Sequence, residues 1–519
     1  MALLVVLAWS RRFVQDDAFI SYRYARNLVE GQGLVFNPGE RVEGYTNFVW
    51  TMLMAAGMRL GLPVIGWSHA LGLACFAASL VLVFLLGRRV LASSAWSALA
   101  VTIVGTNFSF STYATGGLET SLQTATVLLA LLLALRALDR PAPRPAEEAA
   151  FSAAAAAALL TRLDSVVLLA PAMAALVLQV LRQPGPRERA RCALALVLPG
   201  AIPLAAWFAW KLAYYGALLP VTFHAKTGGA LGATTKQGLL FLYEYFASYW
   251  MFPQLLWVLV FAAALFRCRD TRLLAAACGL WMLYIVAVGG DFMEFRMMTP
   301  LLPAWTLCVL WPARRLADRR VQLALGAAML VLALAGSWRH QATFRYENGI
   351  ESVADLEEHL SVDRWVAIGQ TLQGAFAGHE DRVTIAVTAA GAIPYYSRAR
   401  TIDMLGLNDP WIARNGIPFK SQPGHERTAP FHYLLARGVN LVIAHPLVVA
   451  PGQPLDLARN FGLPNFRLFD ARPEDVPRTV KLVEIPIGDG FRVLALYLTP
   501  NQFVDAAIRE RGWRTWTPG

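Results

Sequence analysis

The stretch that decides the fold is "QDDAFISYRYARNLVEGQGLVFNPGERVEGYTN", residues 15–47, which lies between two apolar segments. Two adjacent carboxylates, Asp16 and Asp17, stand where the chain leaves the first apolar run, and a polar, turn-rich loop follows them. If the first run enters a bilayer, this acidic pair is held at the membrane surface. The composition of the chain supports that placement.

The composition excludes an ordinary soluble enzyme. Of the 519 residues, 56% are apolar and 16% are charged, and the mean hydropathy is +0.45. The formal charge of +11 comes largely from short basic clusters between apolar runs, a spacing that indicates membrane orientation and no nucleic-acid partner. The five cysteines lie in or beside apolar runs, so we expect no structural disulfides.

The apolar runs predict about eleven transmembrane helices, because a span needs roughly 20 mainly apolar residues. The first run, residues 1–9, lacks the cleavage site of a signal peptide, and we interpret it as a membrane anchor. The other candidate spans lie near residues 66–86, 94–113, 119–137, 149–161, 164–181, 192–213, 249–266, 273–289, 299–313 and 321–337.

Arginine clusters in alternate loops predict the orientation. The positive-inside rule assigns the loops that carry them to the cytoplasm. The outward face then holds a first outer loop at 13–50, a long outer loop at 214–248, and "GGDFMEFRMMTP" at 289–300. The clusters are Arg88 and Arg89; Arg136, Arg140 and Arg144; Arg182, Arg187, Arg189 and Arg191; Arg267, Arg269 and Arg272; and Arg314, Arg315, Arg319 and Arg320.

The character of the chain changes after Trp338 to mixed charge with short β-rich runs such as "VTIAVT" and "NLVIAHP". We therefore expect a transmembrane module at 1–338 and an extracytoplasmic soluble α/β domain at 339–519. The predicted fold class is a polytopic α-helical membrane protein with a C-terminal soluble α/β domain.

The acidic pair has two compatible interpretations. Asp16 can cap a helix that runs to about Leu28 and ends near Gly31, with Asp17 favourable at its positive N-terminus. A carboxylate fixed beside the bilayer is also partly desolvated, which raises its basicity and suits it to act as a general base.

Two outer segments carry groups suited to a sugar and to a phosphate. "FNPGERVEGYTN" gathers Glu43, Tyr45 and Asn47, which match sugar hydroxyls, although a solvated loop is an equal alternative. "LPVTFHAKTGG" places His224 and Lys226 near the bilayer, where Lys226 either contacts lipid headgroups or pairs with the phosphate of a lipid-linked substrate.

The segment 289–300 offers Arg296 as a phosphate ligand, with Asp291 as its orienting partner or as a metal ligand; a simple salt bridge between the two is equally compatible. We interpret Glu119, Arg162 and Asp164 as helix caps or interhelical ties. The eight histidines show no metal-binding spacing. "AGAIPYY" is interpreted as a packed strand, turn and helix, with ligand binding at the strand end as the alternative.

Five strings, in this order, carry a resemblance to a known family: "DDAFISYRYARNL", "NPGERVEGYTNF", "LPVTFHAK", "GGDFMEFRMMTP" and "GAIPYYSRARTIDMLGLND". Together they resemble the mycobacterial-type terminal beta-(1->2)-arabinofuranosyltransferases of the GT-C superfamily and their bacterial relatives. The resemblance covers nearly the whole chain.

The resemblance implies a GT-C enzyme of the inner cell membrane that moves a sugar, with arabinofuranose favoured, from a polyprenyl-phosphate donor to an extracytoplasmic glycan with inversion. It implies Asp16 as the base, with Asp17 second, and Lys226 and Arg296 as phosphate ligands. A divalent ion on Asp16, Asp17 or Glu43 is a possible addition. A transporter or flippase, and a non-catalytic glycan-binding membrane protein, are the alternative functions.

Overall fold

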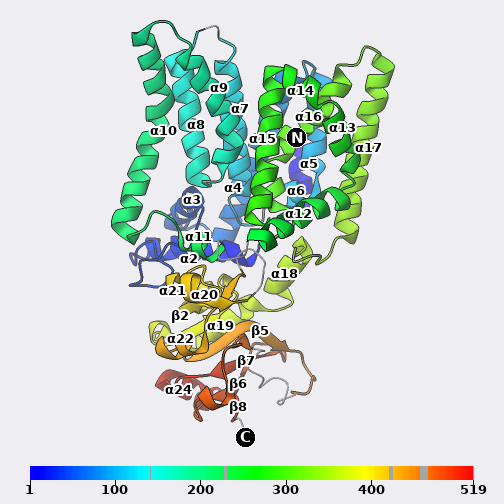
Figure 1. The fold of residues 1–519 in the computed structure, drawn as a ribbon. Coiled ribbons are helices and arrows are strands. Elements are labelled where there is room, and N and C mark those ends of the chain that lie inside the picture. The colour runs from blue at the N-terminus through cyan, green and yellow to red at the C-terminus, as the bar shows by residue number, and fades with distance from the viewer. Residues whose placement is uncertain (141, 227–230, 420–424, 456–465, 518–519) are drawn as a thin grey trace.

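A computed structural model describes the chain except residues 141, 227–230, 420–424, 456–465 and 518–519, and except the side chains of residues 226, 231 and 473. A bundle of roughly parallel helices forms one end of the molecule, and a β-sheet with its own helices forms the other (Figure 1). We call residues 2–343 the helical part and residues 344–517 the sheet part. Helices α2 (Asp16–Val29) and α11 (Val221–Lys226) lie between them.

The helices of the bundle coincide with most of the predicted spans. Among the described residues, five are long and apolar enough to cross a membrane, namely α4, α7, α10, α15 and α17, and α5 and α9 are shorter apolar helices. The predicted total of eleven stays a prediction. The helices are α1 (Ala2–Ser10), α4 (Val64–Val90), α5 (Ser94–Thr106), α7 (Thr120–Ala137), α8 (Pro145–Thr161), α9 (Ser165–Leu181), α10 (Pro186–Tyr215), α15 (Arg269–Val288), α16 (Leu302–Arg314) and α17 (Arg319–Thr343).

The structure differs from the predicted spans in three places. The run 249–266 is two short helices, α13 (Phe252–Val260) and α14 (Ala262–Arg267), and the run 94–113 is broken at Asn107 between α5 and α6 (Phe108–Thr112). The long outer loop contains the 18-residue helix α12 (Leu231–Ser248). The sequence does not predict this helix as an apolar run, because its first turns are polar. Helix α3 (Phe48–Arg59) is too short to count as a span.

The arginine-rich loops meet at the end of the bundle away from the sheet part. Arg89 bonds Asp139 and Asp270, and Arg269 bonds Asp139 as well. These ion pairs join the loops after α4, α7 and α14. At least three of the five basic loops therefore share one side, as the sequence predicts.

The sheet part is built on a six-stranded mixed sheet in the order β2-β1-β5-β7-β6-β8. Strand β1 pairs in parallel with β2 and β5, and the remaining pairs are antiparallel. The strands are β1 (Thr384–Val387), β2 (Arg400–Asp403), β5 (Leu441–Val449), β6 (Lys481–Pro486), β7 (Arg492–Tyr497) and β8 (Arg514–Trp516), and a separate pair is β3 (Ile417–Pro418) with β4 (Arg427–Thr428).

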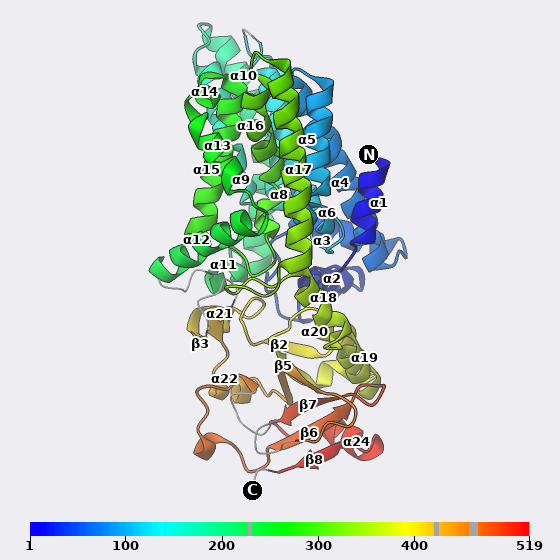
Figure 2. The ribbon, with the colours of Figure 1, turned by 90° about the vertical axis from the view of Figure 1, so that its right-hand side faces the viewer.

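Helices lie on both sides of this sheet and connect it to the bundle (Figure 2). Helix α17 continues to Thr343, beyond the predicted boundary at residue 338. The helices are α18 (Val353–Ser361), α19 (Trp365–Ala375), α20 (Ala392–Ser397), α21 (Pro410–Asn415), α22 (Phe431–Ala436) and α24 (Gln502–Glu510), with single 3₁₀ turns η1 (Arg296–Met298), η2 (Glu380–Arg382) and η4 (Pro473–Asp475).

Arg23 of α2 joins the first outer loop to the sheet part. It is 1% exposed, and it donates to the carbonyls of Phe36 (2.7 Å), Ala399 (2.8 Å) and Pro394. Each of these carbonyls is buried away from water, so a lost donor leaves an unsatisfied acceptor. The predicted helix from Asp16 to about Leu28 is confirmed by α2, and its buried face carries this contact.

We expect Arg23→Gln to lower the free energy of unfolding by on the order of 3 kcal/mol, because one amide cannot replace a guanidinium that serves several carbonyls. Thermal melting of the detergent-solubilised protein, followed by tryptophan fluorescence, measures the effect. Arg59→Gln is the matched control, since Arg59 is exposed at the end of α3. Equal melting temperatures for the two variants would contradict the role given to Arg23.

Candidate active site

Asp16 caps a helix of the sheet part and not its own. Gln15 is the N-cap residue of α2 and makes no side-chain cap bond. The Asp16 carboxylate accepts hydrogen bonds from the backbone N–H groups of Gly391 (3.0 Å) and Ala392 (2.7 Å), at the start of α20. The predicted capping of α2 is therefore wrong, because the orphan donors that Asp16 satisfies belong to a helix far along the chain.

The approach at this contact is close enough to require glycine. A Cβ atom on Gly391 would lie 1.9 Å from the backbone oxygen of Asp16. Burial raises the pKa of Asp16 to about 7, although the N–H of Ala392 acts in the opposite direction. The Asp16 carboxylate is thus held in a fixed position by the sheet part.

Asp17 lies where two hollows meet. One is a cavity of about 350 Å³ between α2 and the sheet part, which we call the sheet cavity. The other is a small pocket of about 70 Å³, the connecting pocket. Asp16 lines only the first of these two, whereas Asp17 lines both.

The connecting pocket leads toward a larger cavity of about 620 Å³ in the helical part, the bundle cavity. Arg162, Arg296, Thr222 and Thr46 line both the connecting pocket and the bundle cavity. The remaining walls of the bundle cavity are largely apolar and come from α10, α15 and the segment before α11. A continuous series of hollows therefore runs from the bundle, past Asp17, to the sheet part.

The two arginines are held by carboxylates. Arg296 bonds Asp291 (2.7 Å), which confirms the predicted salt bridge. Arg162 bonds Glu119 (2.8 Å) and Asp164 (2.5 Å), so the interpretation of these residues as interhelical ties is confirmed. Glu119 and Asp164 also occupy the N-cap positions of α7 and α9, as the alternative predicts, although neither side chain makes a cap hydrogen bond there.

Burial alone would raise the pKa of Glu119, but Arg162 and Arg296 lower it below its usual value. Both guanidinium groups therefore lie close to the Glu119 carboxylate, and both line the connecting pocket and the bundle cavity. A cluster with this charge pattern can accept an anion on its guanidinium edges.

Glu43, Tyr45 and Asn47, predicted to bind the acceptor, lie at these hollows but already have partners. Glu43 forms a buried ion pair with Lys211 of α10 (2.8 Å), and burial raises the pKa of Glu43 to about 6. Tyr45 meets the hydroxyl of Tyr215 at 3.3 Å, and Asn47 donates to Glu119 at 2.7 Å. Glu43 lines the bundle cavity, while Tyr45 and Asn47 line the connecting pocket.

His224 and Lys226, predicted to bind the phosphate, are not brought into the described walls of the three hollows. His224 lies on α11 against the ring of Phe223. Lys226 ends α11, and its side chain lies outside the described residues. Their neighbour Thr222, which sequence reasoning passed over, lines both the connecting pocket and the bundle cavity.

The side chain of Thr222 is buried together with its hydroxyl group. Thr222 is 7% exposed, and its hydroxyl has no hydrogen-bond partner among the described residues. A buried hydroxyl without a partner is uncommon in folded proteins and points to a missing ligand or water. Arg162 and Lys211 were likewise missed as wall residues, because their positions depend on how separate helices pack.

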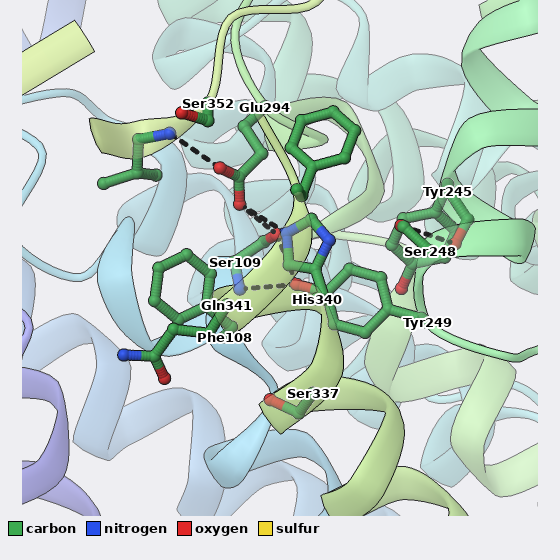
Figure 3. A network of polar contacts seen from close by, with 12 residues as sticks. Phe108, Ser109, Tyr245, Ser248, Tyr249, Glu294, Ser337, His340, Gln341 and Ser352 are labelled. Carbon is green, nitrogen blue, oxygen red and sulfur yellow. Dashed lines mark hydrogen bonds and ion pairs between the residues drawn. The ribbon is translucent and has the colours of Figure 1, made fainter. Parts of the chain in front are cut away.

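The segment 289–300 connects the two large cavities. Phe292 and Met293 line the sheet cavity, while Asp291, Arg296 and Met297 line the bundle cavity. The side chain of Glu294, which is 2% exposed, points away from both and into a polar network (Figure 3).

This network holds the segment from three directions. The Glu294 carboxylate lies 2.7 Å from Nε2 of His340 on α17 and accepts from the backbone N–H of Val353 at the start of α18 (2.6 Å). Ser109 of α6 donates to it at 3.4 Å and also contacts the hydroxyl of Tyr249 at 2.7 Å. The ring of Tyr249 stacks on His340 at 4.1 Å.

We expect Glu294→Gln to destabilise the protein by about 1–3 kcal/mol, because the amide nitrogen would face a donor that the carboxylate now satisfies. The melting temperature in detergent should fall, whereas Glu358→Gln on the exposed face of α18 should leave it unchanged. An unchanged melting temperature in Glu294→Gln would show that the network does not hold the segment.

The residues suggested as metal ligands are divided between different walls. Asp16 and Asp17 line the sheet cavity, while Glu43 is paired with Lys211 at the bundle cavity. Within the described part of the chain, no group of three or more His, Cys, Asp or Glu side chains could hold a metal ion.

The overall fold is similar to those of two solved structures. The structure is similar to ArnT from Cupriavidus metallidurans bound to undecaprenyl phosphate, with a TM-score of 0.53 and 14% identity over 96% of this chain and 98% of that one. It is also similar to the archaeal oligosaccharyltransferase AglB from Archaeoglobus fulgidus in complex with an inhibitory peptide and a dolichol-phosphate, with a TM-score of 0.50 and 11% identity over 95% of this chain and 74% of that one.

The sequence is also similar to those of two characterised proteins. The chain is 28% identical, over 268 residues, to the terminal beta-(1->2)-arabinofuranosyltransferase of Mycobacterium tuberculosis; the match covers 48% of this chain and 40% of that protein. A 42-residue stretch, 8% of this chain and 6% of the relative, is 50% identical to the enzyme of the same name from Corynebacterium glutamicum. The chain thus spans about two fifths of the first relative's length. Residues 342–490 match a family described as a domain of unknown function (DUF8728).

Proposed function

We propose that the chain is a glycosyltransferase that moves a sugar from a polyprenyl-phosphate donor to a glycan acceptor. The observation that carries the proposal is the position of Asp17 between the bundle cavity, whose mouth holds two arginines, and the sheet cavity. A membrane-tethered donor and a water-soluble acceptor have to meet at such a junction. The similarity to arabinofuranosyltransferases favours arabinofuranose as the transferred pentose.

The bundle cavity suits a lipid-linked phosphate. Its apolar walls match an isoprenoid chain, and Arg162, Arg296 and Thr222 line it where it meets the connecting pocket, which is where we place the phosphate. In ArnT and AglB, the bound molecules are likewise an undecaprenyl phosphate and a dolichol-phosphate. Lys226 remains a candidate phosphate ligand on sequence grounds.

The reaction is a single displacement with inversion. Asp17 accepts the proton of an acceptor hydroxyl as its oxygen attacks the anomeric carbon and forms the new glycosidic bond. The bond from that carbon to the phosphate oxygen breaks, and the phosphate leaves with the electron pair toward Arg296 and Arg162. We assign the base to Asp17 and not to Asp16, because Asp17 lines both the sheet cavity and the connecting pocket, whereas Asp16 lines only the sheet cavity.

We propose that the reacting face is extracytoplasmic and that the chain is a multi-pass protein of the cell membrane. The hollows lie at the sheet end of the bundle, whereas Arg89 and Arg269 lie at the opposite end. A transporter would instead place its polar groups near the bilayer midplane.

Asp17→Asn, which keeps the size of the side chain, should lower kcat by about a hundred- to ten-thousand-fold, the usual range for a lost general base. The assay follows radiolabelled sugar from a panel of polyprenyl-phosphate pentoses and hexoses into a glycan acceptor. Asp16→Asn is the matched variant; it should lower the melting temperature and leave kcat nearly unchanged, because its amide offers one acceptor oxygen to the two backbone N–H groups that the two oxygens of Asp16 bind. A larger loss of kcat in Asp16→Asn than in Asp17→Asn would reverse the assignment.

Thr222→Val should raise the KM for the donor by roughly 10-fold or more, since a hydrogen bond to a charged group contributes about 1.5–3 kcal/mol. The variant should melt at or above the wild-type temperature, because it removes a buried hydroxyl that has no partner among the described residues. Donor titrations at saturating acceptor measure the effect. Unchanged donor KM would remove Thr222 from the phosphate site.

A further inference from the structure

The sheet cavity lies at the carboxyl ends of the three parallel strands. In its wall, Thr388 follows β1, Leu405 follows β2, and His445 follows the part of β5 that pairs with β1. In the order β2-β1-β5, the chain passes from β1 to the strand on one side of it and later crosses to the strand on the other side. Open α/β sheets bind ligands outside the carboxyl ends of the strands where the order reverses in this way, which here is between β1 and β5.

An irregularity in β5 places His445 in the wall of this cavity. The register of β5 against β7 shifts between residues 442 and 447, and Ala444 has a φ of 54°, which residues other than glycine rarely adopt. A bulge of this kind changes the direction of the neighbouring side chain and is frequent next to functional sites. The Thr388 N–H donates to the Ala444 carbonyl at 3.0 Å, so Thr388 and His445 leave adjacent strands next to each other.

Three polar side chains of the wall are accessible and have no hydrogen-bond partner. They are Thr388, His445 and Arg467. His445 is exposed, whereas Thr388 and Arg467 are half-buried, and neither the Thr388 hydroxyl nor the Arg467 guanidinium is shielded from solvent. Of the residues that the structure describes, none hydrogen-bonds or ion-pairs with these three side chains, although the Arg467 guanidinium lies over the ring of Phe419 at 5.2 Å. Each of the three can therefore contact a ligand in the cavity.

The chemistry of these groups fits the hydroxyls of a sugar. A threonine hydroxyl and a neutral imidazole each donate and accept, and a guanidinium donates through several N–H groups. Although the ring of His445 reaches solvent, the cavity walls partly desolvate it, and this burial together with the positive charges of His359 and Arg467 lowers the pKa of His445 to about 4. Its imidazole is therefore neutral at pH 7. A sugar with neighbouring hydroxyls can satisfy all three side chains, because each hydroxyl both donates and accepts.

The charges of the wall favour an uncharged sugar over an anionic one. Three carboxylates, Asp16, Asp17 and Glu351, and two cations, Arg467 and His359, line the cavity. His359 counts as a cation because, although burial acts against it, hydrogen bonds to two carboxylates raise its pKa to about 10. A phosphorylated acceptor would thus find no surplus of positive charge. The volume of about 350 Å³ lies at the lower end of the usual range for ligand sites.

We propose that the sheet part recognises the acceptor, with Thr388, His445 and Arg467 binding the hydroxyls of an uncharged sugar and setting the preference of the enzyme for it. All three residues lie within 342–490, the region that matches the domain of unknown function. The inference rests on the proposed glycosyl transfer and gives this domain a role in it. The helical part holds the donor phosphate in that reaction, so separate parts of the chain select the donor and the acceptor.

The test uses Thr388→Val, His445→Phe and Arg467→Met, which remove the polar atoms and keep much of the shape of each side chain. With polyprenyl-phosphate arabinofuranose as donor and arabinotriose as acceptor, the acceptor KM should rise about 3- to 10-fold in the first two variants, the range for a neutral hydrogen bond. It should rise roughly 10-fold or more in Arg467→Met, because the lost donor is charged. The donor KM and the melting temperature should not change.

His432→Phe and Arg509→Met are the matched controls. Both residues are exposed on the sheet part and line none of the three hollows, so the acceptor KM should keep its wild-type value in both variants. An unchanged acceptor KM in two of the three cavity variants would overturn the inference, even if transfer itself is observed.

A second measurement separates acceptor binding from catalysis. Saturation-transfer NMR on the full chain without donor should detect arabinotriose bound to the wild type, with a weaker signal in the three cavity variants and for arabinotriose monophosphate. Tighter binding of the monophosphate would overturn the inference. Binding of arabinotriose that depends on Thr388, His445 and Arg467, without transfer from any donor in the panel, would overturn the proposed function and leave the sugar site standing.

Discussion

The bond between the Asp16 carboxylate and the start of α20 determines how the two parts of the molecule meet. Two backbone N–H groups converge on one side chain, and Gly391 allows the backbones to approach closely. Arg23, on the buried face of the same α2, donates to the carbonyl of Pro394 within α20 and to the carbonyl of Ala399 just after its C-terminal end. Helix α20 is thus held at both ends by the first outer loop. The sheet cavity exists because this docking leaves a space between α2 and the C-terminal end of β1.

The same docking explains why one segment can serve two cavities. Residues 289–300 leave α15 at the bundle cavity, reach the sheet cavity at Phe292 and Met293, and return to the bundle cavity at Arg296 and Met297 before α16 begins. Such a segment carries many backbone groups and needs partners wherever it is buried. Glu351 supplies partners to its backbone, since the Glu351 N–H donates to the Phe292 carbonyl (2.7 Å) and the Glu351 carbonyl accepts from the Glu294 N–H (3.0 Å). The Glu294 side chain in turn bonds His340 of a bundle helix and the N–H of Val353 at the start of α18.

Sequence reasoning was most successful where the determining contacts are local. The helix over residues 16–28, the break between α8 and α9, and the Asp291–Arg296 pair all depend on residues close in the chain. The strand, turn and helix of "AGAIPYY" also follow from local pattern and are confirmed by β1 and α20. The five cysteines are free, as their position in apolar runs predicts.

The parts that escaped prediction depend on contacts between distant segments. The partner of Asp16 lies 375 residues away, so no spacing rule could separate capping of α2 from capping of α20. Lys211 is hidden within the apolar sequence of α10 and becomes meaningful only beside Glu43. The sequence around Trp365 predicts an ordinary core residue, and only the structure shows that Trp365 lines the sheet cavity. When a site is assembled from several helices, the sequence of each helix alone gives little indication of it.

The carboxylates beside Arg162 and Arg296 repel a phosphate, but they also compensate the charges of the two arginines, because a buried arginine without a partner destabilises the fold. Asp291 binds Nε and Nη2 of Arg296, and within the described residues Nη1 makes no hydrogen bond. One edge of the guanidinium thus orients it, while the other can face a ligand, as a pre-organised site requires. In the proposed reaction, the phosphate gains negative charge as the sugar leaves. The attraction between the phosphate and both arginines therefore becomes stronger toward the transition state. Only an interaction that is stronger in the transition state than in the ground state accelerates the chemical step.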